Sequence, residues 1–373
     1  MNKKLAVLFL AVLLLLSGCG ISPSGSGTAA PAASPSAAPA VTADPTVEPV
    51  PADPASEPTP AATESDPPAA TEEPGQALYE FNPHLYVPIL TSDIPEDYWE
   101  SFHNLCDALR KGESTFACSS EDAYKWATDS TVLALLFPAA CTRVKGESSD
   151  GSASFENGMG KITYQMPAEE YVERQAKFET LIEDILNTCL EPDDDEFEKS
   201  LKLFDYMTAN FVYEYDFVEQ KTDWYVYCAL MIGRGQCIDL SGVYAYLLLQ
   251  SGVEAVSVGG YGPGMDHEWT YLIIGGKGYY SDPTWALRSE GDPLGLYYFL
   301  MSKERRANDG FEMDDLTAGL LPRFWLEQSN LKLLSAEDGD CFPSGSFFVS
   351  MDEEKKIVHY QCSNEEAEYG YPK

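Results

Sequence analysis

Residues 233–285 read GRGQCIDLSGVYAYLLLQSGVEAVSVGGYGPGMDHEWTYLIIGGKGYYSDPTW. The rest of the chain is organised around this stretch. Gly233 and Gly235 favour a tight loop, and apolar residues then recur at helical spacing until Gly252 provides a stop. The pattern predicts a buried helix with Cys237 on its first turn, where unpaired backbone N–H groups and the helix dipole favour a thiolate. A lone cysteine is also typical of a small buried side chain, so its position alone defines no site.

A β-hairpin is predicted next, because His267–Ile274 and Lys277–Asp282 have strand character and are joined by the turn Gly275-Gly276. If the residues flanking this turn oppose each other, His267 lies diagonally beside Asp282, about 7–8 Å away at the backbone. A slip of one residue would put the two on opposite faces. Taken singly, His267 fits a satisfied strand histidine and Asp282 a turn residue, but together they fit a base held by its acid.

Cys237, His267 and Asp282 are, in chain order, a candidate nucleophile, base and orienting acid. A thiol needs a neighbouring base to become a nucleophile, and the base needs a partner that holds its tautomer. The chain has only four histidines, so a surplus of histidine does not explain the pattern. We therefore predict a catalytic triad.

At these residues the sequence resembles the transglutaminase-like superfamily of papain-fold cysteine enzymes. The resemblance rests on GRGQC at the cysteine, HEW at the histidine and DPTW at the aspartate, and it extends from Glu198 to Arg306. It implies an α+β, papain-like/transglutaminase-core fold, in which the nucleophile helix packs on an antiparallel β-sheet, with an N-terminal mixed extension. It also implies that Cys237 is the nucleophile, His267 the base and acid, and Asp282 the orienter.

Two positions depart from that family pattern. Thr270 stands where members often have asparagine, and Gly278 stands where an aromatic residue is common. Members often use an upstream glutamine or aromatic side chain at the oxyanion. The candidates here are Trp224, Tyr225 and Tyr227, and the sequence does not rank them.

The chain begins with an export signal. Lys3 and Lys4 precede an apolar run, Leu5–Leu16, that is too short to span a bilayer comfortably. Residues 16–19 (LSGC) resemble the bacterial lipobox, which implies cleavage before Cys19 and a lipid on its thiol. The alternative is an ordinary secretory signal with a chance cysteine. We expect a protein lipid-anchored to the bacterial cell membrane on its extracytoplasmic, cell-surface side.

Composition divides the remaining chain. The segment from 20 to 75 is rich in Pro, Ala, Ser, Thr and acids and has no aromatic residue, Lys or Arg, which predicts a disordered spacer. A tether and a linker without a length requirement fit equally well. The expected organisation is a signal peptide at 1–18, a lipid-anchored linker at 19–76, an N-terminal mixed α/β region at 77–190, a catalytic core at 191–310 and a C-terminal extension at 311–373.

Periodicity predicts further elements that carry no chemistry. Helices are expected at 97–110, 168–190 and 195–211, another at 295–306, and a hairpin at 346–362. His103 is expected on a helix surface and His359 in a strand. The acidic run ending at Asp195 is expected to cap the helix that follows it.

Charge and cysteine content exclude several classes of protein. The formal net charge is −36, so nucleic acid is not an expected partner. The nine cysteines include Cys19 and Cys237, and the remaining seven cannot all pair with one another. Such unpaired thiols in an exported protein point to a reducing or anoxic habitat. No Cys/His spacing typical of zinc occurs, and we expect neither metal nor cofactor.

The sequence therefore predicts a cell-surface cysteine enzyme that transfers the acyl group of peptide or protein amides through a thioester. Water as acceptor makes it a peptidase or amidase, an amine makes it a transglutaminase, and we favour hydrolysis. One alternative is a non-catalytic surface module that binds peptides or cell-wall material. Another is the solute-binding lipoprotein of a transporter, although paired α/β lobes are not evident. The sequence does not determine the oligomeric state.

Overall fold

The structure is a computed structural model that describes residues 79–91, 94–145, 154–215, 225–262, 264–312, 334–336 and 341–371. The chain separates into two units, Met1–Gln76 and Ala77–Lys373, and every described residue belongs to the second unit. The predicted signal peptide, the lipid site Cys19 and the linker thus lie outside the described residues. Among the helices that are described, none has the length and apolar character needed to cross a bilayer.

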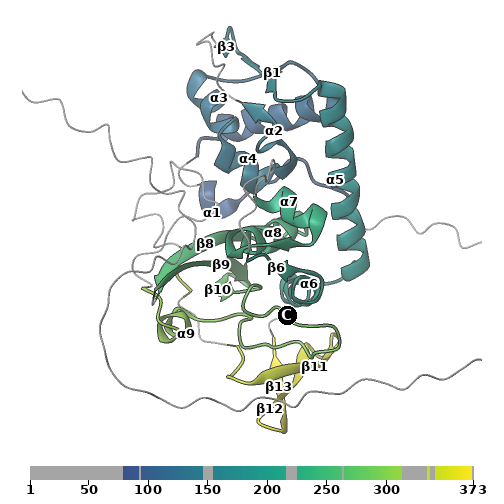
Figure 1. The fold of residues 1–373 in the computed structure, drawn as a ribbon, viewed down its shortest axis with the longest axis vertical. Helices are drawn as coiled ribbons and strands as arrows, with labels where there is room; N and C mark the ends of the chain where they lie inside the picture. Colours follow the sequence, from purple (N-terminus) through teal and green to yellow (C-terminus); the bar gives the residue numbers. More distant parts are fainter. Residues whose placement is uncertain are drawn as a thin grey trace, which may run out of the picture. The chain divides into compact units, whose positions relative to one another are not determined.

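The first part of the described unit consists of helices and very short strands (Figure 1). Its elements are α1 (Pro88–Thr91), α2 (Glu96–Lys111), β1 (Thr115–Ala117), α3 (Glu121–Ala127), α4 (Ser130–Leu136), a 3-10 turn (Pro138–Ala140), β2 (Val144–Lys145), β3 (Phe155–Glu156), β4 (Met159–Lys161) and β5 (Thr163–Tyr164). The helix predicted at 97–110 is α2, and its apolar face is buried. That face holds α2 against the rest of the unit.

Two longer helices follow, α5 (Ala168–Cys189) and α6 (Glu196–Asn210), close to their predicted bounds. The start of α6 is fixed by Asp195, whose Oδ1 accepts hydrogen bonds from the backbone N–H groups of Phe197 and Glu198, both at 3.0 Å. In return, Glu198 Oε2 accepts from the Asp195 N–H at 2.8 Å. This reciprocal capping box satisfies the unpaired donors of the first turn.

The centre of the fold is α8 (Cys237–Gln250), a helix buried on nearly all sides. It packs between α7 (Tyr225–Ile232) and an antiparallel sheet of β8 (Ala255–Gly262), β9 (Met265–Ile274) and β10 (Lys277–Ser281), in the order β10–β9–β8 (Figure 1). Gly252, at φ +87°, ends the helical segment as its sequence predicts. The molecule is thus a mixed α+β protein with a cysteine-bearing helix on an antiparallel sheet.

The predicted hairpin and its register are confirmed. Ile274 opposes Lys277, and the ladder continues to Ser281 opposite Thr270. The turn residues Gly275 and Gly276 have φ values of +58° and +75°, which a two-residue hairpin turn favours and glycine adopts readily. The third strand, β8, was not predicted. It makes β9 the central strand of the sheet.

The helix predicted at 295–306 is wrong over most of its length. Only α9 (Lys303–Asn308) is helical. Upstream, Gly295 forms a β-bridge with Phe347, and Met301 forms one with Tyr280. Between these two bridges the run makes a turn, in which the Phe299 N–H donates to the Leu296 carbonyl at 3.2 Å and Leu300 has a φ of +50°.

The C-terminal part is a three-stranded antiparallel sheet, β11 (Ser346–Asp352), β12 (Ile357–Cys362) and β13 (Glu365–Gly370). The first two strands form the predicted hairpin, and β13 adds a strand that was not predicted. His359 lies in β12, as expected, with Nδ1 3.4 Å from Glu368 of β13.

A buried carboxylate joins this sheet to α6. Glu198, 1% exposed, accepts a hydrogen bond from the Tyr371 hydroxyl at 2.6 Å and from Lys356 Nζ at 2.8 Å. Burial works to raise the pKa of Glu198, but the hydrogen bonds from Lys356, Tyr371 and the Asp195 N–H outweigh it and lower the pKa below its ordinary value. The ring of Phe197 stacks on Tyr371 at 4.2 Å between centroids.

Candidate active site

Cys237 is the first residue of α8, as its sequence predicts. The chain reaches it through β7 (Arg234–Gly235), which pairs in parallel with β6 (Val212–Tyr213). A Cβ at Gly235 would lie 2.5 Å from the Cβ of Asp239, so only glycine fits where the loop passes the first turn of α8. The Gln236 N–H donates to Asp239 Oδ2 at 2.9 Å and fixes the start of the helix.

The environment of the half-buried Cys237 thiol differs from the expectation of a thiolate. Burial and then the negative charge of Glu268 raise the pKa of the Cys237 thiol to about 12, and the charge of Asp282 adds to this effect. Backbone N–H groups at Glu268 and Ile238 act in the opposite direction and are outweighed. The resting group is thus a neutral thiol, because burial and nearby carboxylates exceed the effect of the helix N-terminus.

His267 and Asp282 meet as the hairpin parity predicts. His267 Nε2 lies 2.7 Å from Asp282 Oδ2, and the two side chains are 3% and 0% exposed. The imidazole ring also stacks on Trp285, with centroids 4.8 Å apart and an interplanar angle of 17°. Because Nε2 is engaged by the carboxylate, Nδ1 is the nitrogen left for proton exchange with another group.

Asp282 is held by four contacts. Its Oδ1 accepts from the Trp285 N–H at 3.1 Å, and its own N–H donates to the Tyr298 carbonyl at 2.8 Å. Its Oδ2 accepts from Arg306 Nη2 at 3.1 Å in addition to His267. Burial works to raise the pKa of Asp282, but the His267 charge and hydrogen bond and the Arg306 charge outweigh it, so the pKa is lowered. Asp282 is therefore ionised.

Glu268, which sequence reasoning did not single out, is a half-buried acid next to His267 in β9. Its Oε2 accepts from Ser257 Oγ at 3.2 Å, and Ser257 Oγ lies 2.7 Å from Ser241 Oγ of α8. Burial and the charge of Asp239 raise the pKa of Glu268 to about 7 against the opposing Ser257 hydrogen bond. The HEW motif contains this carboxyl, but only the fold shows that it influences the thiol.

The two departures from the family pattern have structural reasons. Thr270 is fully buried, and its hydroxyl donates to the Ser241 carbonyl at 2.9 Å, which ties β9 to α8. At Gly278, a Cβ would lie 2.3 Å from the hydroxyl of Tyr271, so the neighbouring strand already fills that space with an aromatic ring.

Tyr227 and His103 contact residues outside the predicted triad. Tyr227 packs under the guanidinium of Arg174, 3.3 Å from its ring centroid, and Trp224 lies outside the described residues. His103 stacks on His84 at 4.8 Å, in the α2 region. Within the described ranges, Cys237 makes no hydrogen bond to His267. The structure therefore assembles the base with its acid more tightly than the base with the nucleophile.

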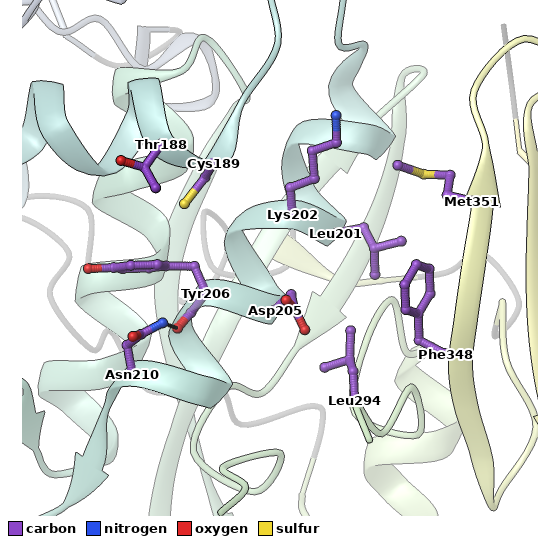
Figure 2. Close-up of a pocket in the computed structure, with 10 residues that line it drawn as sticks. All are labelled: Thr188, Cys189, Leu201, Lys202, Asp205, Tyr206, Asn210, Leu294, Phe348 and Met351. Carbon is purple, nitrogen blue, oxygen red and sulfur yellow. Dashed lines mark hydrogen bonds between the residues drawn. The ribbon is translucent and has the colours of Figure 1, made fainter. Parts of the chain in front are cut away.

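A groove of about 330 Å³ lies between α5, α6 and β11, and it contains none of the triad residues (Figure 2). Its charged groups already have partners: Lys202 Nζ lies 2.5 Å from Asp194, and Asp205 lies 2.5 Å from Arg288 Nη2. Burial, with the charge of Asp205, raises the pKa of the Cys189 thiol to about 11. We assign no chemistry to this groove.

The described residues include neither a cluster of metal ligands nor a disulfide. No group of three or more His, Cys, Asp or Glu side chains there could hold a metal ion. The eight cysteines that the structure describes are thiols rather than disulfides.

Residues 183–283, which include Cys237, His267 and Asp282, match the core domain of the transglutaminase-like superfamily. The chain thus has a transglutaminase-like domain over this segment. A solved structure titled as a "putative cysteine protease" from Cytophaga hutchinsonii is similar at 19% identity and a TM-score of 0.25, over 29% of this chain and 37% of that chain. This chain therefore spans 37% of the length of that structure. No curated protein matches at a significant level.

Proposed function

We propose that the protein is a thiol-dependent acyl-transfer enzyme with a papain-like core, which cleaves peptide or protein amides through a thioester on Cys237. The observation that carries the proposal is the 2.7 Å contact between His267 Nε2 and the buried, ionised Asp282. A carboxylate in this place orients the imidazole and stabilises the imidazolium that forms during the reaction. Cys237, at the start of the helix that packs on β9, supplies the nucleophile.

The first half-reaction makes the thioester. As Cys237 Sγ attacks the carbonyl carbon, its proton passes to His267, because the resting thiol has too high a pKa to ionise beforehand. Backbone N–H groups at the start of α8 stabilise the oxyanion of the tetrahedral intermediate. The C–N bond then breaks as His267 returns the proton to the leaving amine.

The second half-reaction frees the enzyme. His267 takes a proton from water, the water oxygen attacks the thioester carbon, and the C–S bond breaks as the proton returns to Sγ. The product is a carboxylic acid. An amine in place of water gives a new amide by the same steps, and we favour water as the acceptor.

The proposed enzyme works outside the cytoplasm, held to the membrane by a lipid on Cys19 and separated from it by the acidic spacer. With a net charge of −36, the protein is unsuited to nucleic acid and is repelled by anionic lipid, so the lipid is its main anchor. Cys19→Ala should move the protein from the membrane fraction to the soluble fraction. Continued sedimentation with membranes contradicts the anchor.

A non-catalytic module that binds peptides or cell-wall material is the second candidate. The observations that favour it are the raised pKa of the Cys237 thiol and the lack of a hydrogen bond between that thiol and His267 in the described structure. The two candidates differ in whether the thiol is needed.

The deciding experiment compares wild type, Cys237→Ala and the control Cys189→Ala, another half-buried thiol of the same unit. Fluorescein-labelled casein reports hydrolysis, and dansylcadaverine reports transfer to an amine. We expect Cys237→Ala to fall to background and Cys189→Ala to keep wild-type cleavage. Cleavage by Cys237→Ala at the wild-type rate contradicts the enzyme. An inactive wild type that binds casein as tightly as Cys237→Ala supports the binding module.

A further inference from the structure

Arg306 is a fully buried cation in contact with the third triad residue. Its side chain is 0% exposed, Nη2 donates to Asp282 Oδ2 at 3.1 Å, and Nη1 donates to Asp309 Oδ2 at 3.2 Å. It lies in α9, 24 residues after Asp282, and outside the segment that matches the transglutaminase-like core. The sequence resemblance reaches Arg306, but the roles it implies are those of Cys237, His267 and Asp282, and it assigns Arg306 none.

Three aromatic rings hold the guanidinium in place. Its Cζ lies 4.4 Å from the ring centroid of Trp269, 4.8 Å from Trp285 and 4.6 Å from Phe311. A charge removed from water needs compensation, and here two carboxylates and three ring faces provide it. Because Trp285 also stacks on His267, the cation, the imidazole and the carboxylate are fixed as one packed cluster.

One oxygen of Asp282 serves two cationic partners. Oδ2 accepts from His267 Nε2 at 2.7 Å and from Arg306 Nη2 at 3.1 Å. A buried carboxylate with an imidazole as its only cationic partner binds the imidazolium proton strongly, since the ion pair is poorly screened there. Such a histidine cannot easily act as a base. A second cation on the same oxygen weakens this hold.

We propose that Arg306 is a positioning residue of the site, which keeps Asp282 aligned with His267 and lowers the affinity of His267 for its proton by sharing the carboxylate. The inference rests on the proposed function of His267 as base and acid. Arg306 does not touch the reacting atoms; it acts through Asp282.

The sign of this effect depends on the other groups around the imidazole. The Cys237 thiol at the start of α8 is close enough to Glu268 of β9 and to Asp282 for the charges of both acids to raise its pKa. Among the residues that the structure describes, the titratable and charged groups around the cluster are Cys237, Glu268, Asp282, Tyr298, Arg306 and Asp309. Arg306 is the cation of this set, so its neutralisation leaves the imidazolium among acids and makes its proton harder to remove.

The test is an NMR titration of the full chain labelled with ¹⁵N-histidine. The chain has four histidines, and His267→Gln assigns the signal by its loss. We expect Arg306→Met to raise the titration midpoint of the His267 imidazole by about one pH unit. Arg306→Gln, which can still donate to Asp282 without charge, should shift it similarly and serves if the methionine variant does not fold.

Two further variants separate charge from structure. Arg306→Lys keeps the charge and should hold the midpoint close to wild type. Arg305→Met is the matched control, because Arg305 is its neighbour in α9 and bonds to the carbonyls of Tyr297 and Phe342, away from the triad. It should lower thermal stability and leave the His267 titration unchanged.

A folded neutral Arg306 variant with the wild-type midpoint overturns the proposal. So does a lysine variant whose midpoint rises by about a full unit, or an Arg305→Met variant that shifts as far as Arg306→Met. The titration needs no substrate, so it remains decisive for a protein that cleaves nothing. Failure of the acyl-transfer function would appear instead as an inactive wild type in the casein assay.

Discussion

Two carboxylates of this fold, Asp282 in the candidate site and Glu198 under the C-terminal sheet, are buried to a similar degree but have different kinds of hydrogen-bond partner. Neither residue is more than 1% exposed. Glu198 is bonded by Lys356 and Tyr371. The contact with Glu198 raises the pKa of Lys356, and burial followed by that contact raises the pKa of Tyr371, so both groups keep their protons through the neutral range. Its charge is permanently compensated, which suits a structural joint.

Asp282 is compensated in part by a group that exchanges its proton. Its Oδ2 is shared between the guanidinium of Arg306 and the imidazole of His267, and in the proposed reaction His267 takes up and returns a proton. The comparison shows that burial does not distinguish a structural carboxylate from a candidate catalytic one. The distinction lies in whether a partner can titrate.

The largest expected effect is on turnover. Asp282→Asn should lower kcat/KM for casein cleavage by at least about 1,000-fold, because an amide neither holds the imidazole in the required tautomer nor stabilises the imidazolium. Steady-state kinetics at several pH values measure the loss.

Glu198→Gln is the matched control for that loss. We expect Glu198→Gln to change kcat/KM by no more than about threefold, because Glu198 supports the structure around Lys356 and Tyr371 and does not contact the triad. A comparable loss of turnover in both variants would show that the two carboxylates do not differ in function.

The second effect is on stability, for which Glu198 is expected to matter more than Asp282. Glu198→Ala should lower the free energy of unfolding by about 3 kcal/mol, because it leaves the Lys356 and Tyr371 contacts without their acceptor. Denaturant titration measures this. The folded-state pKa of Glu198 is lowered, so its contribution is full above the unfolded value of about 4.3 and is lost as pH falls through the folded value. The gap between variant and wild type should therefore narrow in acid; a gap that is constant with pH contradicts the ionised clamp.

The smallest effect concerns Glu268, whose charge opposes formation of the thiolate. Glu268→Gln should speed alkylation of Cys237 by iodoacetamide about tenfold at pH 8, which corresponds to one unit of thiol pKa. Peptide mass spectrometry follows Cys237 separately from the other thiols. Glu254→Gln is the control, because Glu254 is another half-buried acid with a raised pKa that precedes β8. Equal alkylation profiles for wild type and Glu268→Gln would remove Glu268 from the thiol's environment.

The same variant gives a stability check of opposite sign to Glu198. The folded pKa of Glu268 is raised to about 7, so ionisation of Glu268 destabilises the folded state. This penalty is absent below the unfolded pKa of about 4.3 and is fully present above pH 7. The melting temperature of Glu268→Gln should match that of wild type at pH 4 and exceed it at pH 8.

Local patterns predicted the parts of the site that depend on local structure. The period of the apolar residues after Cys237 and the stop at Gly252 define α8, and the Gly275-Gly276 turn fixes the hairpin register. That register brings His267 to Asp282. Each of these inferences used residues close in sequence, where periodicity and turn chemistry act directly.

The remaining parts depend on distant contacts. Arg306 follows an apolar run whose pattern predicts a helix. Only the tertiary structure, through the bridges of Gly295 and Met301 to other strands, replaces that helix with a turn. Glu198 stands where a helix-capping glutamate is common, and nothing in the neighbouring sequence indicates that the Tyr371 hydroxyl bonds to it. The expectation of a thiolate at Cys237 was not met for the same reason, because burial and the charge of Glu268, which raise the pKa of the thiol, arise only in the tertiary structure.

The joint between Glu198 and Tyr371 has a consequence for the order of events during synthesis. The two residues are 173 positions apart, and Asn82 and Gln250, also hydrogen-bonded, are 168 apart. Contacts of this separation slow folding, because the intervening chain must be closed before they form. A nascent chain that has emerged only as far as Trp285 contains the whole triad but neither Arg306 nor the partner of Glu198. The reactive arrangement is therefore among the last features to mature, after most of the polypeptide has been made.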